Sequence, residues 1–186
     1  MSESVDLSKY DNSWYHPGRN LFIRICWILI NALFVQCNWN PSSFIRLFSL
    51  RLFGAKIGIG VMIKPGVNIK YPWHLSVGDY VWIGENAWID NLTQVSIGNH
   101  ACISQGAYLL TGNHDFKKNT FDLIVKPVTI EAGVWIGAKA IVCPGVTCRS
   151  HAVLTAGAVA TKDLEDYMIY SGNPAQPVKQ RDIQSS

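Results

Sequence analysis

The chain has 186 residues, of which 48% are hydrophobic and 16% are charged, and its formal net charge is +3. This length accommodates one domain with a sizeable core and excludes two large domains joined by a linker. The small net charge, without a run of Lys or Arg, argues against a nucleic-acid-binding surface, whereas the apolar content predicts burial inside the fold or between copies of the chain.

Residues 1–11 begin the chain with a polar, acidic segment. This segment lacks the basic start and apolar run of a secretory signal, which predicts a cytoplasmic protein. The five cysteines are odd in number and include no CxxC pair, so they show no disulfide pattern, which is consistent with a reducing compartment. Neither a disulfide framework nor a zinc site is therefore expected, and Cys143 and Cys148 are expected to be buried structural thiols rather than a metal pair.

Residues 1–53 are expected to form a mostly helical arm. Residues 21–40 contain neither Gly nor Pro, Pro41 ends this apolar stretch, and residues 42–53 begin a second apolar segment with spaced arginines. Polar side chains interrupt the first stretch at Arg24, Asn31, Gln36 and Asn38. A membrane-spanning helix is therefore not expected.

Two alternatives remain open for this arm. It packs on the main body of the protein, or it makes peripheral contact with a membrane, at the inner surface of the cell membrane. Aromatic and basic side chains suit the headgroup region of a bilayer. The residues for such a contact are Trp27, Phe34, Trp39, Arg46 and Arg51.

From Ile57 onward, an aliphatic or small residue returns at every sixth position, with a few longer gaps. The members are Ile57, Ile63, Ile69, Val77, Ile83, Ile89, Ile97, Ile103, Leu109, Ile130, Ile136, Val142, Cys148, Leu154 and Ala160. A period of six is neither the 3.6 of a helix nor the 2 of a strand, so it indicates a supersecondary repeat. Turn formers such as Gly84-Glu85-Asn86 separate the repeats, which predicts short strands joined by tight corners.

Three such hexads are expected to close one coil of a solenoid. We therefore predict an all-β fold, a parallel β-helix over residues 54–165, followed by a C-terminal tail at residues 166–186. Residues one coil apart should stack on one another. One inner column is predicted to contain Ile57, Val77, Ile97, Ile130 and Cys148.

The repeat has one long interruption, between Leu109 and Ile130. A solenoid accepts extra residues only by looping them out at a corner, so residues 111–127 are predicted to protrude as a loop. Loops of this length in compact folds are usually functional. This loop contains His114.

The pattern [Ile/Leu/Val]-Gly-x-x-[small]-x across residues 54–163 resembles the left-handed β-helix acyltransferases, which include maltose, galactoside and nodulation-factor acetyltransferases. The left-handed sense comes from this resemblance alone, since parallel crossovers are normally right-handed. Four segments are similar to the colanic acid biosynthesis branch of the family. They are Arg51-Leu-Phe-Gly-Ala-Lys-Ile-Gly58, Tyr71-Pro-Trp73, Thr111-Gly-Asn-His-Asp115 and Gly172-Asn-Pro-Ala175.

This resemblance implies a homotrimeric, acetyl-CoA-dependent O-acetyltransferase with active sites between subunits. The acceptor is a saccharide hydroxyl, in exopolysaccharide or another surface-glycan pathway. His114 matches the histidine that removes the proton from the acceptor hydroxyl; a hydroxyl is a poor nucleophile at neutral pH, and an imidazole titrates close enough to pH 7 to act as its base. Two alternatives stay open: a non-catalytic trimeric binding scaffold, and an N-acetyltransferase that acts on an amine or amino sugar.

The resemblance places coenzyme A in the groove between neighbouring chains, against the late coils. Trp135 faces the pantetheine arm, unless it serves only to pack the hexads. The residues expected to supply backbone hydrogen bonds are Ala138, Ala156 and Ala158, and those near the nucleotide end are Thr161 and Lys162. Lys162 and Lys179 carry the charge that suits the phosphates.

Acceptor recognition rests on the polar residues near the loop. Glu85, Asp90 and Asn91 lie in the coil that precedes His114, where they contact sugar hydroxyls or form turns. Asp115 either orients His114 or is a turn residue. A metal site is not expected, because the β-helix carbonic anhydrases need three converging histidines and no such spaced trio is present.

Overall fold

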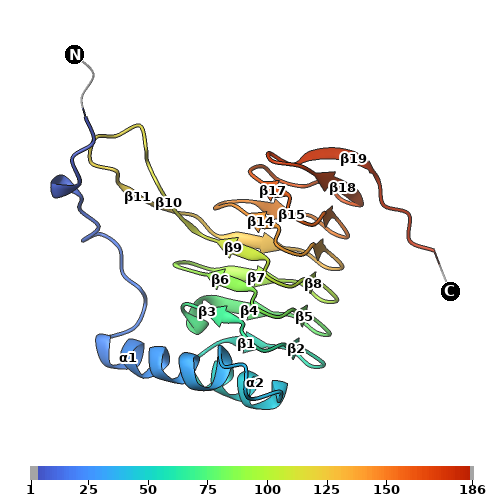
Figure 1. The fold of residues 1–186 in the computed structure, drawn as a ribbon, viewed down its shortest axis with the longest axis horizontal. Helices are drawn as coiled ribbons and strands as arrows, with labels where there is room; N and C mark the ends of the chain where they lie inside the picture. The colour runs from blue at the N-terminus through green and yellow to red at the C-terminus, as the bar shows by residue number, and fades with distance from the viewer. Residues whose placement is uncertain (1–3, 185–186) are drawn as a thin grey trace.

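The computed structural model describes residues 4–184, so residues 1–3 of the predicted arm and residues 185–186 of the predicted tail lie outside the described residues. Short strands wind into a parallel β-solenoid, and two helices lie across one of its ends (Figure 1). The predicted fold class, a β-helix with a helical arm and a protruding loop, is confirmed.

The α-helices of the N-terminal arm lie in its second part. A short 3-10 turn, η1, spans Leu7–Lys9, and extended chain leads from there to Asn20. Helix α1 spans Leu21–Ile30 and continues as a π-helical segment, η2, over Asn31–Val35. Asn20 starts α1, because its side-chain oxygen accepts a hydrogen bond from the Ile23 N–H at 3.0 Å. Helix α2 spans Ser43–Leu52.

Three parallel sheets form the walls of the solenoid. The first contains β1 (Lys56–Ile57), β4 (Leu75–Val77), β7 (Val95–Ile97), β12 (Val128–Ile130) and β15 (Thr147–Cys148). The second contains β2 (Met62–Ile63), β5 (Trp82–Ile83), β8 (Cys102–Ile103), β13 (Trp135–Ile136), β16 (Val153–Leu154) and β18 (Met168–Ser171), with β19 (Gln176–Gln180) antiparallel to β18. The third contains β3 (Asn68–Ile69), β6 (Trp88–Asp90), β9 (Tyr108–Leu110), β14 (Ile141–Val142) and β17 (Val159–Ala160).

The sixth-position residues face inward and stack from coil to coil. Ile57 pairs with Val77, which continues to Ile97, Ile130 and Cys148, as predicted. Nearly all the sixth-position residues are buried, and each buried aliphatic side chain contributes about 1.5–3 kcal/mol by leaving water. Cys148 is fully buried in its column, as expected, whereas Cys143 is only half-buried, which corrects the expectation for that residue.

The corner between the first and second sheets requires a left-handed backbone conformation. The residues there with positive φ are Gly60, Tyr80, His100, Gly133, His151 and Tyr167. Ring stacking accompanies this conformation: Tyr80 lies on His100 with centroids 5.3 Å apart, and His151 lies on Tyr167 at 4.6 Å. Both histidines are therefore corner residues, as their place in the hexad indicated.

Within residues 4–184, no helix is both long enough and apolar enough to cross a bilayer.

A substitution at Gly98 tests how closely neighbouring coils approach one another. A Cβ at this position would lie 2.7 Å from the backbone nitrogen of Ala132 and 2.8 Å from the carbonyl carbon of Glu131, so that Gly98→Ala must push two coils apart. A Cβ at Gly157 would meet nothing within 4 Å, and Gly157→Ala is strained only by its φ of +70°, at about 1–2 kcal/mol. We expect Gly98→Ala to lower Tm more than Gly157→Ala in thermal unfolding. If Gly98→Ala lowers Tm by the same amount as Gly157→Ala or by less, the result would contradict this close packing of the coils.

Candidate active site

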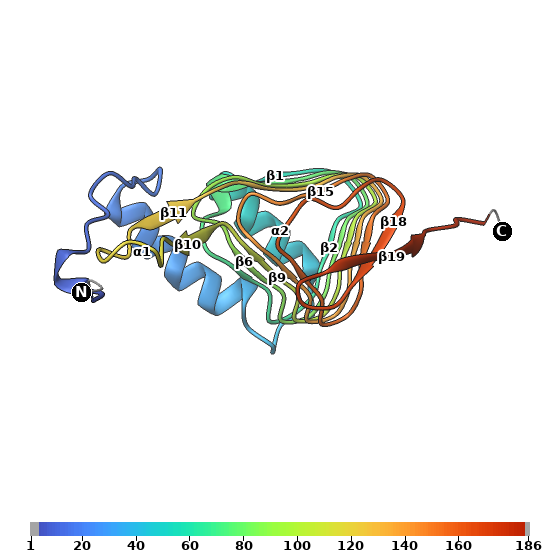
Figure 2. The same ribbon diagram turned by 90° about the horizontal axis from the view of Figure 1, so that it is seen from above.

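The interruption of the repeat is a β-hairpin that projects from a corner of the solenoid (Figure 2). Strand β10 (Gly112–His114) pairs antiparallel with β11 (Leu123–Val125), so that His114 lies opposite Leu123. Thr111 fixes the base of the hairpin: it is fully buried, and its hydroxyl donates to the Asp90 carbonyl at 3.0 Å. The hairpin therefore leaves the coil at one fixed place.

The imidazole of His114 is held by its own hairpin. Its Nδ1 lies 2.9 Å from the carbonyl oxygen of Phe121. A carbonyl only accepts hydrogen bonds, so Nδ1 carries the proton, and in the neutral ring Nε2 keeps its lone pair. The ring also stacks on Phe121, with centroids 4.4 Å apart and planes at 7°. This arrangement presents a fixed nitrogen base.

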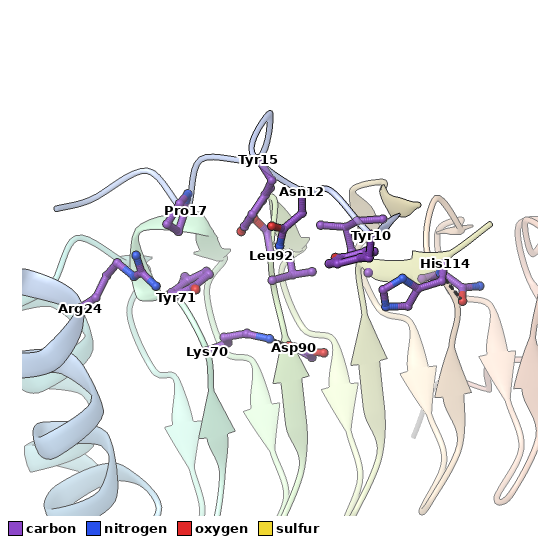
Figure 3. A pocket seen from close by; sticks show the side chains of 13 residues that line it. Tyr10, Asn12, Tyr15, Pro17, Arg24, Lys70, Tyr71, Asp90, Leu92 and His114 are labelled. Carbon is purple, nitrogen blue, oxygen red and sulfur yellow. Dashed lines mark hydrogen bonds and ion pairs between the residues drawn. The ribbon is translucent and has the colours of Figure 1, made fainter. Parts of the chain in front are cut away.

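His114 lines a cavity of about 550 Å³ between the hairpin, the solenoid and the extended part of the arm (Figure 3). The lining residues are Tyr10, Asn12, Tyr15, Pro17, Arg24, Lys70, Tyr71, Asp90, Leu92, Gly112, Asn113, His114 and Leu123. Tyr10 contacts the imidazole from the arm, with ring centroids 5.7 Å apart. The wall is mostly polar and aromatic.

The cavity contains one paired and one unpaired cation. Lys70 Nζ lies 2.9 Å from Asp90 Oδ1, and the Tyr108 hydroxyl donates to Asp90 Oδ2 at 3.2 Å. Burial, and then the nearby carboxylate, raise the pKa of Tyr108 to about 12, so this donor stays protonated. Among the described residues, the Arg24 guanidinium has no hydrogen bond or ion pair. Because Asp90 offsets Lys70, Arg24 makes the cavity electropositive.

Three hydrogen bonds fasten the arm and the corner residues around the cavity. The Tyr15 hydroxyl donates to the Leu92 carbonyl at 2.7 Å, and its burial raises the pKa of this phenol. The Trp73 indole donates to the Pro17 carbonyl at 2.6 Å. Asn91 Nδ2 donates to the Tyr71 carbonyl at 2.6 Å. The extended arm is therefore a fixed wall of the cavity.

The four predicted acceptor residues differ in placement. Asp90 lines the cavity, whereas the fully buried Asn91 spends both ends of its amide on the Tyr71 backbone, at 2.6 and 3.0 Å. Asp115 accepts a hydrogen bond from the Lys117 N–H at 3.1 Å and forms a turn of the hairpin rather than the cavity wall. Glu85 lies in a separate hollow of about 260 Å³, beside the second sheet.

The comparisons with known proteins identify the family. A family profile described as "Hexapeptide repeat of succinyl-transferase" matches residues 127–162. The chain is 36% identical over 169 residues to the putative colanic acid biosynthesis acetyltransferase of Escherichia coli K12, covering 90% of this chain and 91% of that protein. The chain belongs to the hexapeptide-repeat acetyltransferases.

Two solved structures share the fold of this acetyltransferase. One is a hexapeptide-repeat acetyltransferase from Vibrio cholerae complexed with acetyl coenzyme A, with a TM-score of 0.78 and 21% identity over 87% of this chain and 88% of that one. The other is a galactoside acetyltransferase in complex with coenzyme A, with a TM-score of 0.78 and 23% identity over 87% and 82%. At these identities the likeness shows the fold.

The predicted coenzyme residues of the acetyltransferase lie outside the His114 cavity. Trp135 is 47% exposed on the outer face of the second sheet, and its indole donates to Ser104 Oγ at 2.9 Å. Ala158 is buried: its N–H donates to the Thr155 carbonyl, its carbonyl accepts from the Ile141 N–H of the neighbouring coil, and the Ala138 carbonyl accepts from the Gly157 N–H. The exposed members are Ala156, Thr161, Lys162 and Lys179. The second sheet and the hairpin lie on opposite sides of the solenoid (Figure 2).

The contribution of the arm to the cavity was not predictable from the sequence pattern. The residues of the arm that line it are Tyr10, Asn12, Tyr15, Pro17 and Arg24, and Lys70 and Tyr71 of the first coil were also not predicted. Tyr71 stands in a segment that carried the resemblance, but without a role. An extended segment has no periodicity that predicts where it docks, so only tertiary structure places Tyr10 and Tyr15. Within residues 4–184, no group of three or more His, Cys, Asp or Glu side chains is arranged to hold a metal ion.

A substitution at Asn91 tests whether its hydrogen bonds stabilise the wall of the cavity. Asn91→Leu keeps the number and branching of the side-chain heavy atoms but removes both hydrogen bonds to the Tyr71 backbone, which is expected to lower the free energy of unfolding by about 1–3 kcal/mol. Urea unfolding measures this loss. The Asn113 side chain is exposed and accepts a hydrogen bond only from the neighbouring His114 N–H, so Asn113→Leu is the matched control and should change stability by less than about 0.5 kcal/mol. Equal stability of the two variants would contradict the role of Asn91.

Proposed function

We propose that this protein transfers the acetyl group of acetyl-CoA to a hydroxyl of a saccharide bound in the cavity, with His114 as general base. The observation that carries the proposal is the contact between His114 Nδ1 and the Phe121 carbonyl. It leaves Nε2 as the proton acceptor at the wall of a polar cavity. An activated hydroxyl is what acetyl transfer to a sugar requires.

The chemistry proceeds by addition and elimination at the thioester carbonyl. His114 Nε2 takes the proton of the acceptor hydroxyl as its oxygen attacks the carbonyl carbon. The carbon–sulfur bond then breaks, and the leaving thiolate takes the proton from the imidazolium. The Phe121 carbonyl stabilises the imidazolium, because it accepts the Nδ1–H throughout. General-base catalysis of this kind typically contributes roughly 10² to 10⁴ in rate.

The donor is proposed to bind between two copies of the chain. Trp135 and the exposed lysines Lys162 and Lys179 suit the pantetheine arm and the phosphates, and the two similar structures contain acetyl coenzyme A or coenzyme A. Trp135 belongs to β13 of the second sheet, and this sheet lies on the opposite side of the solenoid from the hairpin (Figure 2). A site that contains both Trp135 and His114 therefore needs two copies, which a homotrimer supplies in a closed ring.

The acceptor is proposed to be a saccharide of a surface glycan. A cavity of about 550 Å³ accommodates more than one sugar ring, its tyrosines offer faces for sugar rings, and Asp90 and Lys70 offer hydrogen bonds to hydroxyls. The relative named for colanic acid biosynthesis supports a glycan pathway. Because acetyl-CoA is the donor, we place the reaction in the cytoplasm.

The unpaired Arg24 extends this proposal to the charge of the acceptor. Arg24 and His114 lie at opposite ends of the cavity (Figure 3). A guanidinium binds carboxylates and phosphates through two parallel hydrogen bonds. We therefore expect the acceptor to carry an anionic group that is separated from the reacting hydroxyl.

His114→Asn tests the general base. The variant is expected to lower kcat for coenzyme A release by roughly 10² to 10⁴, with Tm nearly unchanged, when acetyl-CoA and a panel of saccharides are supplied. The matched control is His100→Asn, because His100 occupies a corner with a φ of 58° that Asn tolerates. Turnover of the His114→Asn variant at the rate of the control would refute the mechanism. A product that resists hydroxylamine, as an amide does, would instead indicate an amine acceptor.

Arg24→Gln tests the charge of the acceptor. For an acceptor with a carboxylate, kcat/KM is expected to fall about 10- to 100-fold, because a hydrogen bond to a charged group is worth about 1.5–3 kcal/mol. For the matched neutral sugar, such as a glucoside in place of a glucuronide, little change is expected. Arg149→Gln alters an exposed arginine near Glu165 and serves as the control. Equal effects on both acceptors would contradict an anion subsite.

A further inference from the structure

Helix α1 presents most of its apolar side chains to solvent rather than to the protein. Trp27 is 1% exposed and faces the solenoid, and its indole donates to the Ile69 carbonyl at 2.9 Å. The side chains on the opposite face are large, apolar and 49–74% exposed. They are Leu21, Phe22, Ile25, Ile28 and Leu29 of α1, together with Leu33 of its continuation η2. Amphipathic helices of globular proteins show the reverse arrangement, so this face is built to be covered.

Helix α2 repeats this arrangement beside α1. Leu50 and Arg46 are fully buried, whereas Phe44, Phe48 and Leu52 form an exposed row at successive turns. The predicted membrane contact through Trp27 and Arg46 is therefore wrong, because the protein itself covers both side chains. Phe44 and Phe48 are 75% and 58% exposed, and their rings stack on each other at 6.5 Å. Both helices lie across the same end of the solenoid (Figure 1). Their exposed apolar rows, together with Trp39 in the connection, are here called the end face.

The end face belongs to a part of the chain without acidic residues. All 13 Asp and Glu residues lie outside residues 12–78, whereas this segment contains seven of the 16 Lys and Arg residues. The Arg46 guanidinium donates hydrogen bonds to the backbone carbonyls of Val35, Cys37, Asn40 and Ser42. These bonds stabilise the turn between the helices, and no carboxylate among the described residues neutralises the charge. Arg51, Lys56 and Lys64 are exposed near the end face.

We propose that the end face docks on the surface of an anionic lipid bilayer. A bilayer covers apolar rows with acyl chains and meets Arg and Lys with its phosphates, and Trp suits the boundary between the two. A second copy fits less well, because two end faces would bring like charges together and neither contains a carboxylate. The contact is peripheral, since neither helix is long enough to cross a bilayer.

The docking helix also forms part of the proposed acceptor site. Arg24 comes from α1, between the exposed Phe22 and Ile25, and it lines the cavity. Docking therefore places the Arg24 end of the cavity nearest the bilayer. This consequence rests on the proposed function, whereas the docking itself does not.

Vesicle co-sedimentation of the full chain tests the proposal. The probes are vesicles of phosphatidylcholine alone and of phosphatidylcholine mixed with phosphatidylglycerol. We expect binding to the mixed vesicles, at least 10-fold weaker binding to phosphatidylcholine alone, and a loss of binding as salt rises. The variant Phe22→Gln/Leu29→Gln/Phe48→Gln alters only exposed side chains and should lower binding at least 10-fold. The matched control Val178→Gln/Ile183→Gln alters exposed apolar residues of the tail and should bind like the parent.

Three outcomes would overturn the proposal. They are no binding to the mixed vesicles, equal binding of the two variants, and binding that does not depend on phosphatidylglycerol. Light scattering on the same samples tests the competing occupant, a second copy of the chain. If the parent does not bind vesicles and the triple variant changes its oligomeric state, the end face joins copies of the chain. Because no readout depends on acetyl transfer, failure of the proposed function leaves this test intact.

Discussion

The stacking of an inward aliphatic residue on the equivalent residue of the next coil is the constraint on which the rest of the structure depends. The columns at Ile57, Ile63 and Ile69 continue upward through parallel backbone pairing, so a coil cannot lengthen without losing both its core contacts and its hydrogen bonds. Extra residues therefore leave only at corners. The long insertion is forced out as a hairpin, and buried Thr111 fixes where it begins.

This constraint makes the candidate active site a composite of three parts. The hairpin provides His114, the corner of the coils provides the Lys70–Asp90 ion pair, and the arm provides Tyr10 and Arg24. None of the three encloses a cavity alone. Two hydrogen bonds join the arm to the solenoid, from the Tyr15 hydroxyl to the Leu92 carbonyl and from the Trp73 indole to the Pro17 carbonyl. They explain why the extended part of the arm keeps a fixed position. The arm thus belongs to the site as well as to the fold.

The sequence predicted those features that follow from a period. The column from Ile57 to Cys148 pairs as expected, and the break in the period located the hairpin. Features set by a single side-chain contact were not predictable. The helical stretch ends at Val35 rather than near Pro41, in a π-helical segment where the buried Asn31 amide reaches Asn68 at 2.8 Å.

The polar residues near the hairpin show the same limit of prediction from sequence. Asp90, Asn91 and Asp115 are chemically similar in sequence, yet one lines the cavity, one holds the Tyr71 backbone and one forms a turn. Their functions depend on which groups lie within hydrogen-bond distance, and spacing along the chain does not encode that. The proposed membrane contact of the arm follows instead from exposure, because Phe22 and Phe44 face solvent although both are strongly apolar.

A crystal structure of the protein with coenzyme A and a saccharide acceptor tests the central claim most directly. We expect the thiol to enter the cavity from a groove that contains Trp135 of a neighbouring copy. The acceptor hydroxyl should then lie about 3 Å from His114 Nε2, with Nδ1 still bonded to the Phe121 carbonyl. A thiol bound away from His114, or a hydroxyl that faces a different base, would contradict the claim.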